Sequence, residues 1–274
     1  MIRFLPFAAL GILFTLPASA ATTAGPAKGN LVIVGGGQIG PDIAEKFLEL
    51  AGGKDSPIVV IPTAGGAEKY EPSYLDKSWL TKAGATKLTL LHTTDRAVAD
   101  SPAFVEAITK ARAVWFDGGR QWHLVDSYLN TRTQKELFAL LNRGGVIGGS
   151  SAGATIIGSY LVRGAHEGNT IMMAPGYEEG LGLMTNVAID QHIITRHREG
   201  DMADVIKVHP DLLGIGIDES TAIVVHGSGF TVLGKSKVAI TEGGRPHYFL
   251  ESGDRFDLTT RAKVAQRATQ RATQ

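Results

Sequence analysis

The sequence contains no cysteine among its 274 residues. Disulfide bonds, a thiolate nucleophile and cysteine-bound metal ions are therefore excluded. An excess of charge of one sign is also lacking, because 27 basic residues balance 27 acidic ones. Nucleic-acid-binding proteins normally carry a basic excess or stripe, so we expect no nucleic-acid partner. After the first 20 residues, no stretch is long and apolar enough to cross a membrane.

The N-terminus has the composition of an export signal. Arg3 supplies a positive charge, residues 4–16 are mostly apolar, and Ala18-Ser19-Ala20 is a small-residue cleavage pattern. A bilayer span needs roughly 18 to 20 apolar residues, more than this stretch provides. We therefore expect residues 1–20 to be a signal peptide that is cleaved after Ala20, and the protein to be secreted or periplasmic and free of the membrane. An uncleaved anchor is the alternative.

Apolar runs that alternate with helical patterns fill the first part of the remaining chain. Uniformly apolar strands between helices are typical of an α/β protein whose parallel sheet is covered on both faces. We expect strands at 31–34, 58–61, 88–91, 113–116 and 146–147, and helices at 41–50, 76–83, 102–110, 120–130, 132–142 and 154–160.

The pattern changes after about residue 185, where short strands separated by hairpin-type turns follow one another. We expect strands at 187–189, 214–217, 221–225, 229–233, 236–240 and 248–250, and a helix at 199–207. These strands are predicted to add to the same sheet, largely antiparallel, so that residues 21–274 form a single domain. The end, from about 258 to 274, is predicted to be a frayed helical tail, and its repeated Arg-Ala-Thr-Gln has no assignable chemistry.

The glycine cluster Gly35-Gly36-Gly37 raises the question of a dinucleotide site. With Gln38, Ile39 and Gly40 it satisfies G-x-G-x-x-G between a strand and a helix. That fingerprint expects an acidic residue about 20 positions later, at the end of the second strand, to hold a ribose. The second strand here ends in Pro62-Thr63, so we favour a tight turn that packs helix against strand.

A more specific motif is Gly149-Ser150-Ser151-Ala152-Gly153, which matches G-x-S-x-G after an apolar strand. This is the context of a nucleophile elbow, a strained turn that lifts a serine hydroxyl above the sheet. The amide of Ala152 can face a developing oxyanion there. The alternative is a glycine-rich turn in which Ser150 or Ser151 caps a helix.

A serine nucleophile needs a base and an acid that orients it. Among eight histidines, His192 is the strongest candidate, because it follows a strand in Asp190-Gln191-His192, and His123 is its nearest rival. The sequence spacing leaves the acid open, and the candidates are Glu167, Glu178, Glu179 and Asp190. No metal-ligand spacing such as H-E-x-x-H occurs, so we expect no metal site.

Four motifs in this order carry a resemblance: Asp117-Gly118-Gly119, the segment 148–154 around Ser151, Asp190-Gln191-His192, and Gly214-Ile215-Gly216-Ile217-Asp218-Glu219. Together they resemble the cyanophycinase branch of the serine peptidase family that also contains the alpha-aspartyl dipeptidases. The match runs from about residue 30 to 240. The resemblance implies a flavodoxin-like, three-layer αβα fold related to class I glutamine amidotransferases, with no cofactor and often a homodimer.

The resemblance also implies a role for each matching residue. Ser151 falls at the nucleophile, His192 at the general base and Glu167 at or near the charge-relay acid. Gly119 and Ala152 match the oxyanion-hole amides. The substrate-pocket positions correspond to Gln121, Asp190, Gln191, Arg196, Arg198 and Glu219. Arginines suit a substrate carboxylate, and carboxylates suit a substrate guanidinium.

Cyanophycinases act on cyanophycin, a poly-aspartate carrying arginine on each β-carboxyl, and release β-Asp-Arg dipeptides. After the histidine the family tends to read Gln-Arg-Gly-Arg-x-Gly-Arg, whereas this chain has His197 in place of glycine and Asp201 in place of the third arginine. The expected function is that of a secreted serine exopeptidase, which hydrolyses cyanophycin or a related aspartyl-arginine polymer to β-Asp-Arg dipeptides through an acyl-enzyme. The alternatives are a dipeptidase or isopeptidase for short aspartyl peptides, and a non-catalytic ligand-binding protein.

Overall fold

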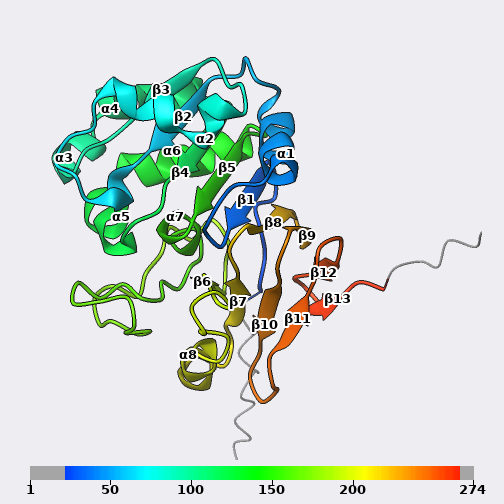
Figure 1. Cartoon of the computed structure of the whole chain (residues 1–274). Helices are drawn as coiled ribbons and strands as arrows, with labels where there is room; N and C mark the ends of the chain where they lie inside the picture. The colour runs from blue at the N-terminus through cyan, green and yellow to red at the C-terminus, as the bar shows by residue number, and fades with distance from the viewer. Residues whose placement is uncertain (1–21, 266–274) are drawn as a thin grey trace, which may run out of the picture.

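The computed structural model describes residues 22–265, and its described strands form two sheets (Figure 1). The larger sheet has the strand order β13-β12-β9-β8-β1-β5-β4-β2-β3, and the smaller has the order β11-β10-β7-β6. The predicted signal peptide (1–20) and the terminal repeat (267–274) lie outside the described residues.

Five neighbouring strands of the large sheet, β1, β5, β4, β2 and β3, run parallel to one another. Antiparallel strands extend this parallel part from β1 outward through β8, β9, β12 and β13. The predicted α/β class, with a parallel sheet and antiparallel C-terminal strands, is therefore confirmed. The bounds are β1 (Asn30–Val34), β2 (Ile58–Ile61), β3 (Leu88–Leu90), β4 (Ala113–Phe116), β5 (Val146–Ser150), β8 (Thr221–His226), β9 (Gly229–Gly234), β12 (Arg255–Asp257) and β13 (Ala262–Lys263).

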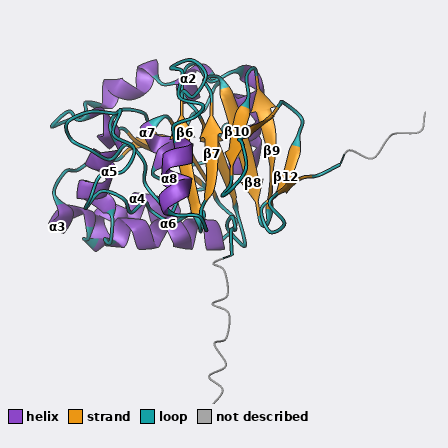
Figure 2. Ribbon diagram, turned by 90° about the horizontal axis from the view of Figure 1, so that it is seen from below, coloured by secondary structure: helices purple, strands orange, loops and turns teal. Residues whose placement is uncertain are grey.

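Alternate side chains of each parallel strand enter different cores, because successive residues of a strand point to opposite faces. In β1, Val32 and Val34 pack with Phe47 of α1, whereas Leu31 and Ile33 pack with α4, α5 and α6. Helices thus cover both faces, as Figure 2 shows from below. The helix bounds are α1 (Pro41–Ala51), α2 (Trp79–Lys82), α3 (Arg96–Ala99), α4 (Pro102–Lys110), α5 (Gln121–Tyr128) and α6 (Arg132–Asn142), with 3-10 turns η1 (Thr63–Gly65) and η2 (Pro72–Lys77).

The helix ends follow from local sequence. Pro41 and Pro102 are the first residues of α1 and α4. An N–H at this position has no partner within the helix, so a proline is tolerated there. The hydroxyl of Ser101 accepts a hydrogen bond from the Phe104 amide and so caps α4. Gly52 ends α1 in the left-handed conformation at φ 96°.

The small sheet corrects the prediction of a single sheet. It consists of β6 (Val187–Gln191), β7 (Leu213–Ile217), β10 (Val238–Thr241) and β11 (Tyr248–Leu250), and β6 and β7 are parallel. One face of the small sheet contributes to the same hydrophobic core as α4, α5 and α6. Helix α8 (Met202–Val208) packs on its other face (Figure 1). An apolar run predicts a buried strand but does not specify its neighbours, so the sequence pattern could not separate the two sheets.

Two further expectations are wrong in part. The helix after the serine motif, α7, spans only Ala152–Thr155 rather than 154–160. The tail predicted from about residue 258 begins as ordered structure, since Leu258 is fully buried and β13 pairs with β12. Within residues 22–265, no helix has the length and apolar character needed to cross a bilayer.

Candidate active site

Ser151 lies in the turn between β5 and α7, above the carboxyl end of the parallel strands. Its backbone has φ 57° and ψ −115°, a conformation that residues other than glycine rarely adopt. The turn needs small neighbours. A Cβ at Gly149 would lie 2.1 Å from the Gly153 carbonyl oxygen, and one at Gly153 would lie 2.3 Å from that of Phe116. This strained strand-to-helix turn has the form of a nucleophile elbow.

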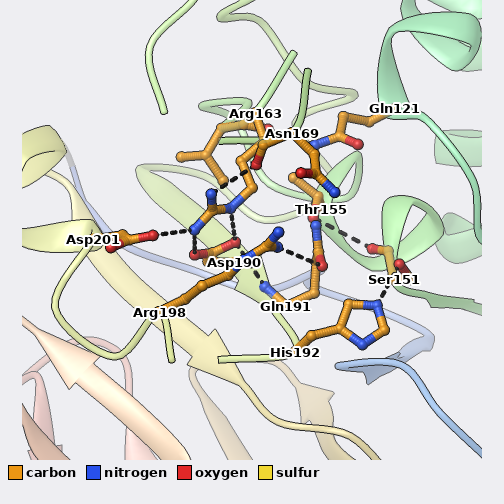
Figure 3. Close-up of polar contacts among 11 residues, drawn as sticks. Gln121, Ser151, Thr155, Arg163, Asn169, Asp190, Gln191, His192, Arg198 and Asp201 are labelled. Carbon is orange, nitrogen blue, oxygen red and sulfur yellow. Dashed lines mark hydrogen bonds and ion pairs between the residues drawn. The ribbon is translucent and has the colours of Figure 1, made fainter. Parts of the chain in front are cut away.

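His192 directly follows β6 and meets Ser151. Its Nε2 lies 2.8 Å from Ser151 Oγ, and its backbone N–H donates to the Gly35 carbonyl (Figure 3). The imidazole is buried, and its residue also has positive φ, 55°. A hydroxyl and an imidazole at this distance form the pairing through which a serine can be deprotonated.

The carboxylate beside His192 belongs to Glu219, which follows β7. Glu219 Oε1 lies 2.6 Å from His192 Nδ1. Because β6 and β7 are adjacent and parallel, the residues after them emerge side by side. The resemblance matched Glu219 to a substrate-pocket position, and the geometry instead makes it the partner of the imidazole.

Glu167, expected at or near the acid position, lies elsewhere. It is exposed and lines a surface pocket with His166, Ile171 and Tyr177. Two other candidates are engaged away from the imidazole, since Glu178 accepts a hydrogen bond from Tyr160 and Asp190 pairs with Arg163. The backbone of Glu179, the remaining candidate, forms an isolated bridge with Tyr160. The position that the resemblance implies for Glu167 therefore does not match the geometry, because Glu167 lies in the loop after α7 whereas the carboxylate beside His192 follows β7.

The pKa of His192 is lowered below its ordinary value. Burial is the largest cause, and it outweighs the hydrogen bond that the imidazole donates to the Glu219 carboxylate, which raises the pKa. The positive charge of Arg196 lowers the pKa further. His192 is therefore neutral at pH 7 and can accept a proton from a hydroxyl.

The glycine cluster after β1 provides space for these residues. A Cβ on Gly36, where φ is 127°, would lie 2.1 Å from His192 Cε1, and one on Gly37 would lie 2.9 Å from the Glu219 Cβ. The tight turn predicted after β1 therefore has a second role at the site. It lets the backbone approach the imidazole and its carboxylate.

The Asp117-Gly118-Gly119 segment lies beside the serine. A Cβ on Gly118 would be 3.7 Å from Ser151 Oγ, and Gly119 has φ 146°. The Asp117 carboxylate anchors the segment by accepting hydrogen bonds from Trp115 Nε1 and the Tyr74 hydroxyl, at 3.0 and 2.9 Å. Burial raises the pKa of Asp117. The amides of Gly119 and Ala152 therefore belong to segments that flank the hydroxyl.

The predicted substrate-pocket residues differ in their surroundings. Gln121 is buried and donates to the Val162 carbonyl at 2.8 Å, whereas Arg196 is exposed. Arg198 is buried, with Nη1 3.5 Å from Gln191 Oε1. Burial is the largest cause of its lowered pKa. Among residues 22–265, no carboxylate lies within ion-pair distance of the Arg198 guanidinium.

Sequence reasoning missed Arg163. This residue lies in the loop after α7, is 1% exposed and pairs with both Asp190 and Asp201. No motif marked it, and an arginine in a loop is normally exposed. In the described part of the chain, no group of three or more histidine and acidic residues is arranged to hold a metal ion.

Comparison with known proteins identifies the family of this chain. The model of peptidase family S51 matches residues 31–233. Cyanophycinase from Geminocystis herdmanii is 30% identical over 230 residues, which cover 81% of this chain and 83% of the relative. Cyanophycinase from a Nostoc species is 30% identical over 268 residues, covering 85% and 87%.

A solved structure is also similar. The crystal structure of a peptidase from an acI-B1 Actinobacterium superposes with a TM-score of 0.65 at 27% identity, and the match covers 87% of this chain and 98% of that one. The family model spans well over half of this chain, and the resemblance found from the four motifs is confirmed. The chain belongs to peptidase family S51 and is a serine peptidase.

Proposed function

We propose that this enzyme hydrolyses cyanophycin, or a related aspartyl-arginine polymer, to β-Asp-Arg dipeptides through an acyl-enzyme on Ser151. The observation that carries the proposal is the chain of contacts from Ser151 Oγ through His192 to Glu219, at 2.8 and 2.6 Å. Its substrate is suggested by the cyanophycinases to which it is 30% identical over alignments that cover 81% and 85% of the chain. The apolar N-terminal segment supports action outside the cytoplasm.

In the first half of the proposed reaction, Ser151 Oγ attacks the carbonyl carbon of an aspartyl peptide bond. His192 Nε2 accepts the hydroxyl proton, and Glu219 stabilises the imidazolium that forms. The amides of Gly119 and Ala152 donate to the oxyanion. The imidazolium then gives its proton to the leaving amine as the C–N bond breaks.

In the second half, water attacks the acyl ester. His192 takes a proton from the water, the new tetrahedral oxyanion collapses, and the imidazolium returns a proton to Ser151 Oγ as the product acid leaves. Arg198 and Gln191 are proposed to bind a substrate carboxylate, because Arg198 is a buried cation without a carboxylate partner within residues 22–265.

The test is release of β-Asp-Arg from purified cyanophycin, measured by liquid chromatography and mass spectrometry. We expect release by the wild-type enzyme and by Ser150→Ala, the matched change at the neighbouring serine. Ser151→Ala should release nothing above background and should lose labelling by a fluorophosphonate serine probe. Labelling without release would contradict the polymer as substrate and direct the search to short aspartyl peptides. Absence of labelling in a folded wild-type enzyme would support a ligand-binding protein instead.

A further inference from the structure

The guanidinium of Arg163 is the most fully paired cation near the site. Its Nε and Nη2 donate to the two carboxylate oxygens of Asp190, at 2.7 and 2.8 Å. Nη2 also donates to Asp201 at 2.7 Å, and Nη1 donates to the Asn169 carbonyl at 2.8 Å. Figure 3 shows this cluster on one side of Gln191, with Ser151 and His192 on the other.

In this arrangement, the carboxylate oxygens of Asp190 are engaged within the protein and are not free to bind a substrate group. Asp190 is 1% exposed, both its oxygens are bound by Arg163, and Oδ1 also accepts from the Gln191 amide at 2.9 Å. A bidentate guanidinium–carboxylate pair is a strong and geometrically specific contact. A buried pair of this kind resists displacement, because opening it would leave an uncompensated charge.

Asp201 is arranged to keep Arg163 in place. It occupies the N-terminal capping position of α8, yet its side chain makes no capping hydrogen bond and pairs with Arg163 instead. The backbone of Arg163 has φ 57°, and its N–H donates to the Met172 carbonyl. The loop therefore holds an arginine in a strained conformation to deliver this one guanidinium.

Two carboxylates and two cations lie in and around this cluster. Arg163 is opposed by the carboxylates of Asp190 and Asp201, and Arg198 supplies the second nearby cation. Burial lowers the pKa of Arg163, but its hydrogen bonds and charge interactions with both aspartates outweigh burial and raise it. Arg163 is therefore charged, as arginine side chains in proteins ordinarily are.

We propose that Arg163 is a specificity-determining residue that supplies, from within the chain, the guanidinium that Asp190 accepts. This inference rests on the proposed function and narrows its substrate class. Asp190 does not bind an arginine side chain of the substrate. The enzyme therefore accepts β-linked aspartyl peptides whose attached residue has a free carboxylate, whether or not that residue carries a guanidinium.

The experiment compares two synthetic oligomers, a (β-Asp-Arg) trimer and the same trimer with citrulline, the uncharged isostere of arginine. The readout is the ratio of kcat/KM for the arginine trimer to that for the citrulline trimer. For the wild-type enzyme we expect a ratio within about threefold of one, since a site that hydrogen-bonds a group normally rejects an analogue lacking it by far more. In Arg163→Ala, Asp190 loses its partner and the ratio should rise to about tenfold or more.

Two variants serve as controls. Arg163→Lys keeps a cation beside Asp190, so its ratio should stay near one. The double variant Arg163→Gln with Asp190→Asn removes the buried carboxylate together with its partner, so it too should stay near one even if Arg163→Ala fails to fold. Serine-probe labelling and thermal unfolding report whether each variant is folded.

A wild-type preference of tenfold or more for the arginine trimer would overturn the inference while leaving the proposed function intact. An unchanged ratio in a folded Arg163→Ala would also overturn it, because Arg163 would then have a structural role alone. If the labelled wild-type enzyme cleaves neither trimer, the proposed function and the inference fall together.

Discussion

Glu219 holds the imidazole of His192 through a short hydrogen bond to Nδ1. That bond fixes the tautomer in which Nε2 keeps its lone pair for the proton of Ser151. In the proposed mechanism, Glu219 also places a negative charge beside the imidazolium that forms during acyl transfer. In the proposed mechanism, the reactivity of Ser151 therefore depends on a residue that lies far from it in the chain.

Replacing Glu219 with glutamine should lower kcat by about 10⁴-fold, because the amide keeps the shape but loses the charge and the tautomer preference. The matched change Glu167→Gln should leave kcat within about twofold, since Glu167 is exposed and makes no contact with His192. Steady-state kinetics on a chromogenic aspartyl ester or peptide would distinguish them. A large loss in Glu167→Gln with a small one in Glu219→Gln would contradict the geometry.

In the proposed mechanism, the pH dependence follows from His192, which must be neutral to act as a base. Burial holds its pKa below the ordinary value, so kcat/KM should fall only as the pH drops through that lowered pKa. Glu219 raises the pKa, so Glu219→Gln should move the acid limb to lower pH. Arg196 lowers it, so Arg196→Gln should move the limb to higher pH. Shifts in the same direction for both variants would show that another group controls the limb.

At the scale of the elements, the site is made by strand ends. The sequence predicted β5 and β6 and hence placed Ser151 and His192 at carboxyl ends, where ligands bind in parallel sheets. It could not predict that β7 lies beside β6, because apolar runs do not encode their neighbours, so the contact between Glu219 and His192 was not predicted. Arg163 was missed for a related reason, since its burial arises from a loop that folds against β6 and α8.

The turn after β1 gives a test at this scale. Gly36→Ala would place a methyl group 2.1 Å from His192 Cε1, so we expect loss of most of the activity as the imidazole is displaced. Gly53→Ala is the matched control, because Gly53 also has positive φ but has no atom within 4 Å of the added Cβ. It should lower stability by about 1 kcal/mol and keep the activity. Kinetics combined with urea unfolding separates the two effects, and equal losses of activity would contradict this role of the turn.

For the whole molecule, the important feature is that the site spans two sheets. Ser151 comes from the large sheet, whereas His192 and Glu219 come from the small one. The two sheets nonetheless share one hydrophobic core, in which Ile33 and Ile147 of the first belong with Ile189 and Ile215 of the second. A shared core opposes independent opening of either sheet.

Unfolding in urea should therefore be a single cooperative transition. The midpoint for loss of serine-probe labelling should coincide with the midpoint from far-ultraviolet circular dichroism. Ser151→Ala, which removes the labelled hydroxyl but no core atom, should keep the same circular dichroism midpoint. Labelling lost at a clearly lower urea concentration would mean that the sheets separate before they unfold.

The positive φ angles of Ser151 and His192 affect how this sequence can change over time. Each such conformation costs of order 1–3 kcal/mol in a residue other than glycine, and both residues adopt it. Glycine at position 151 would relieve the strain and give a more stable protein without a nucleophile. Selection for thermal robustness alone would thus remove the serine, and sequences optimised without an activity requirement should drift toward an inert scaffold.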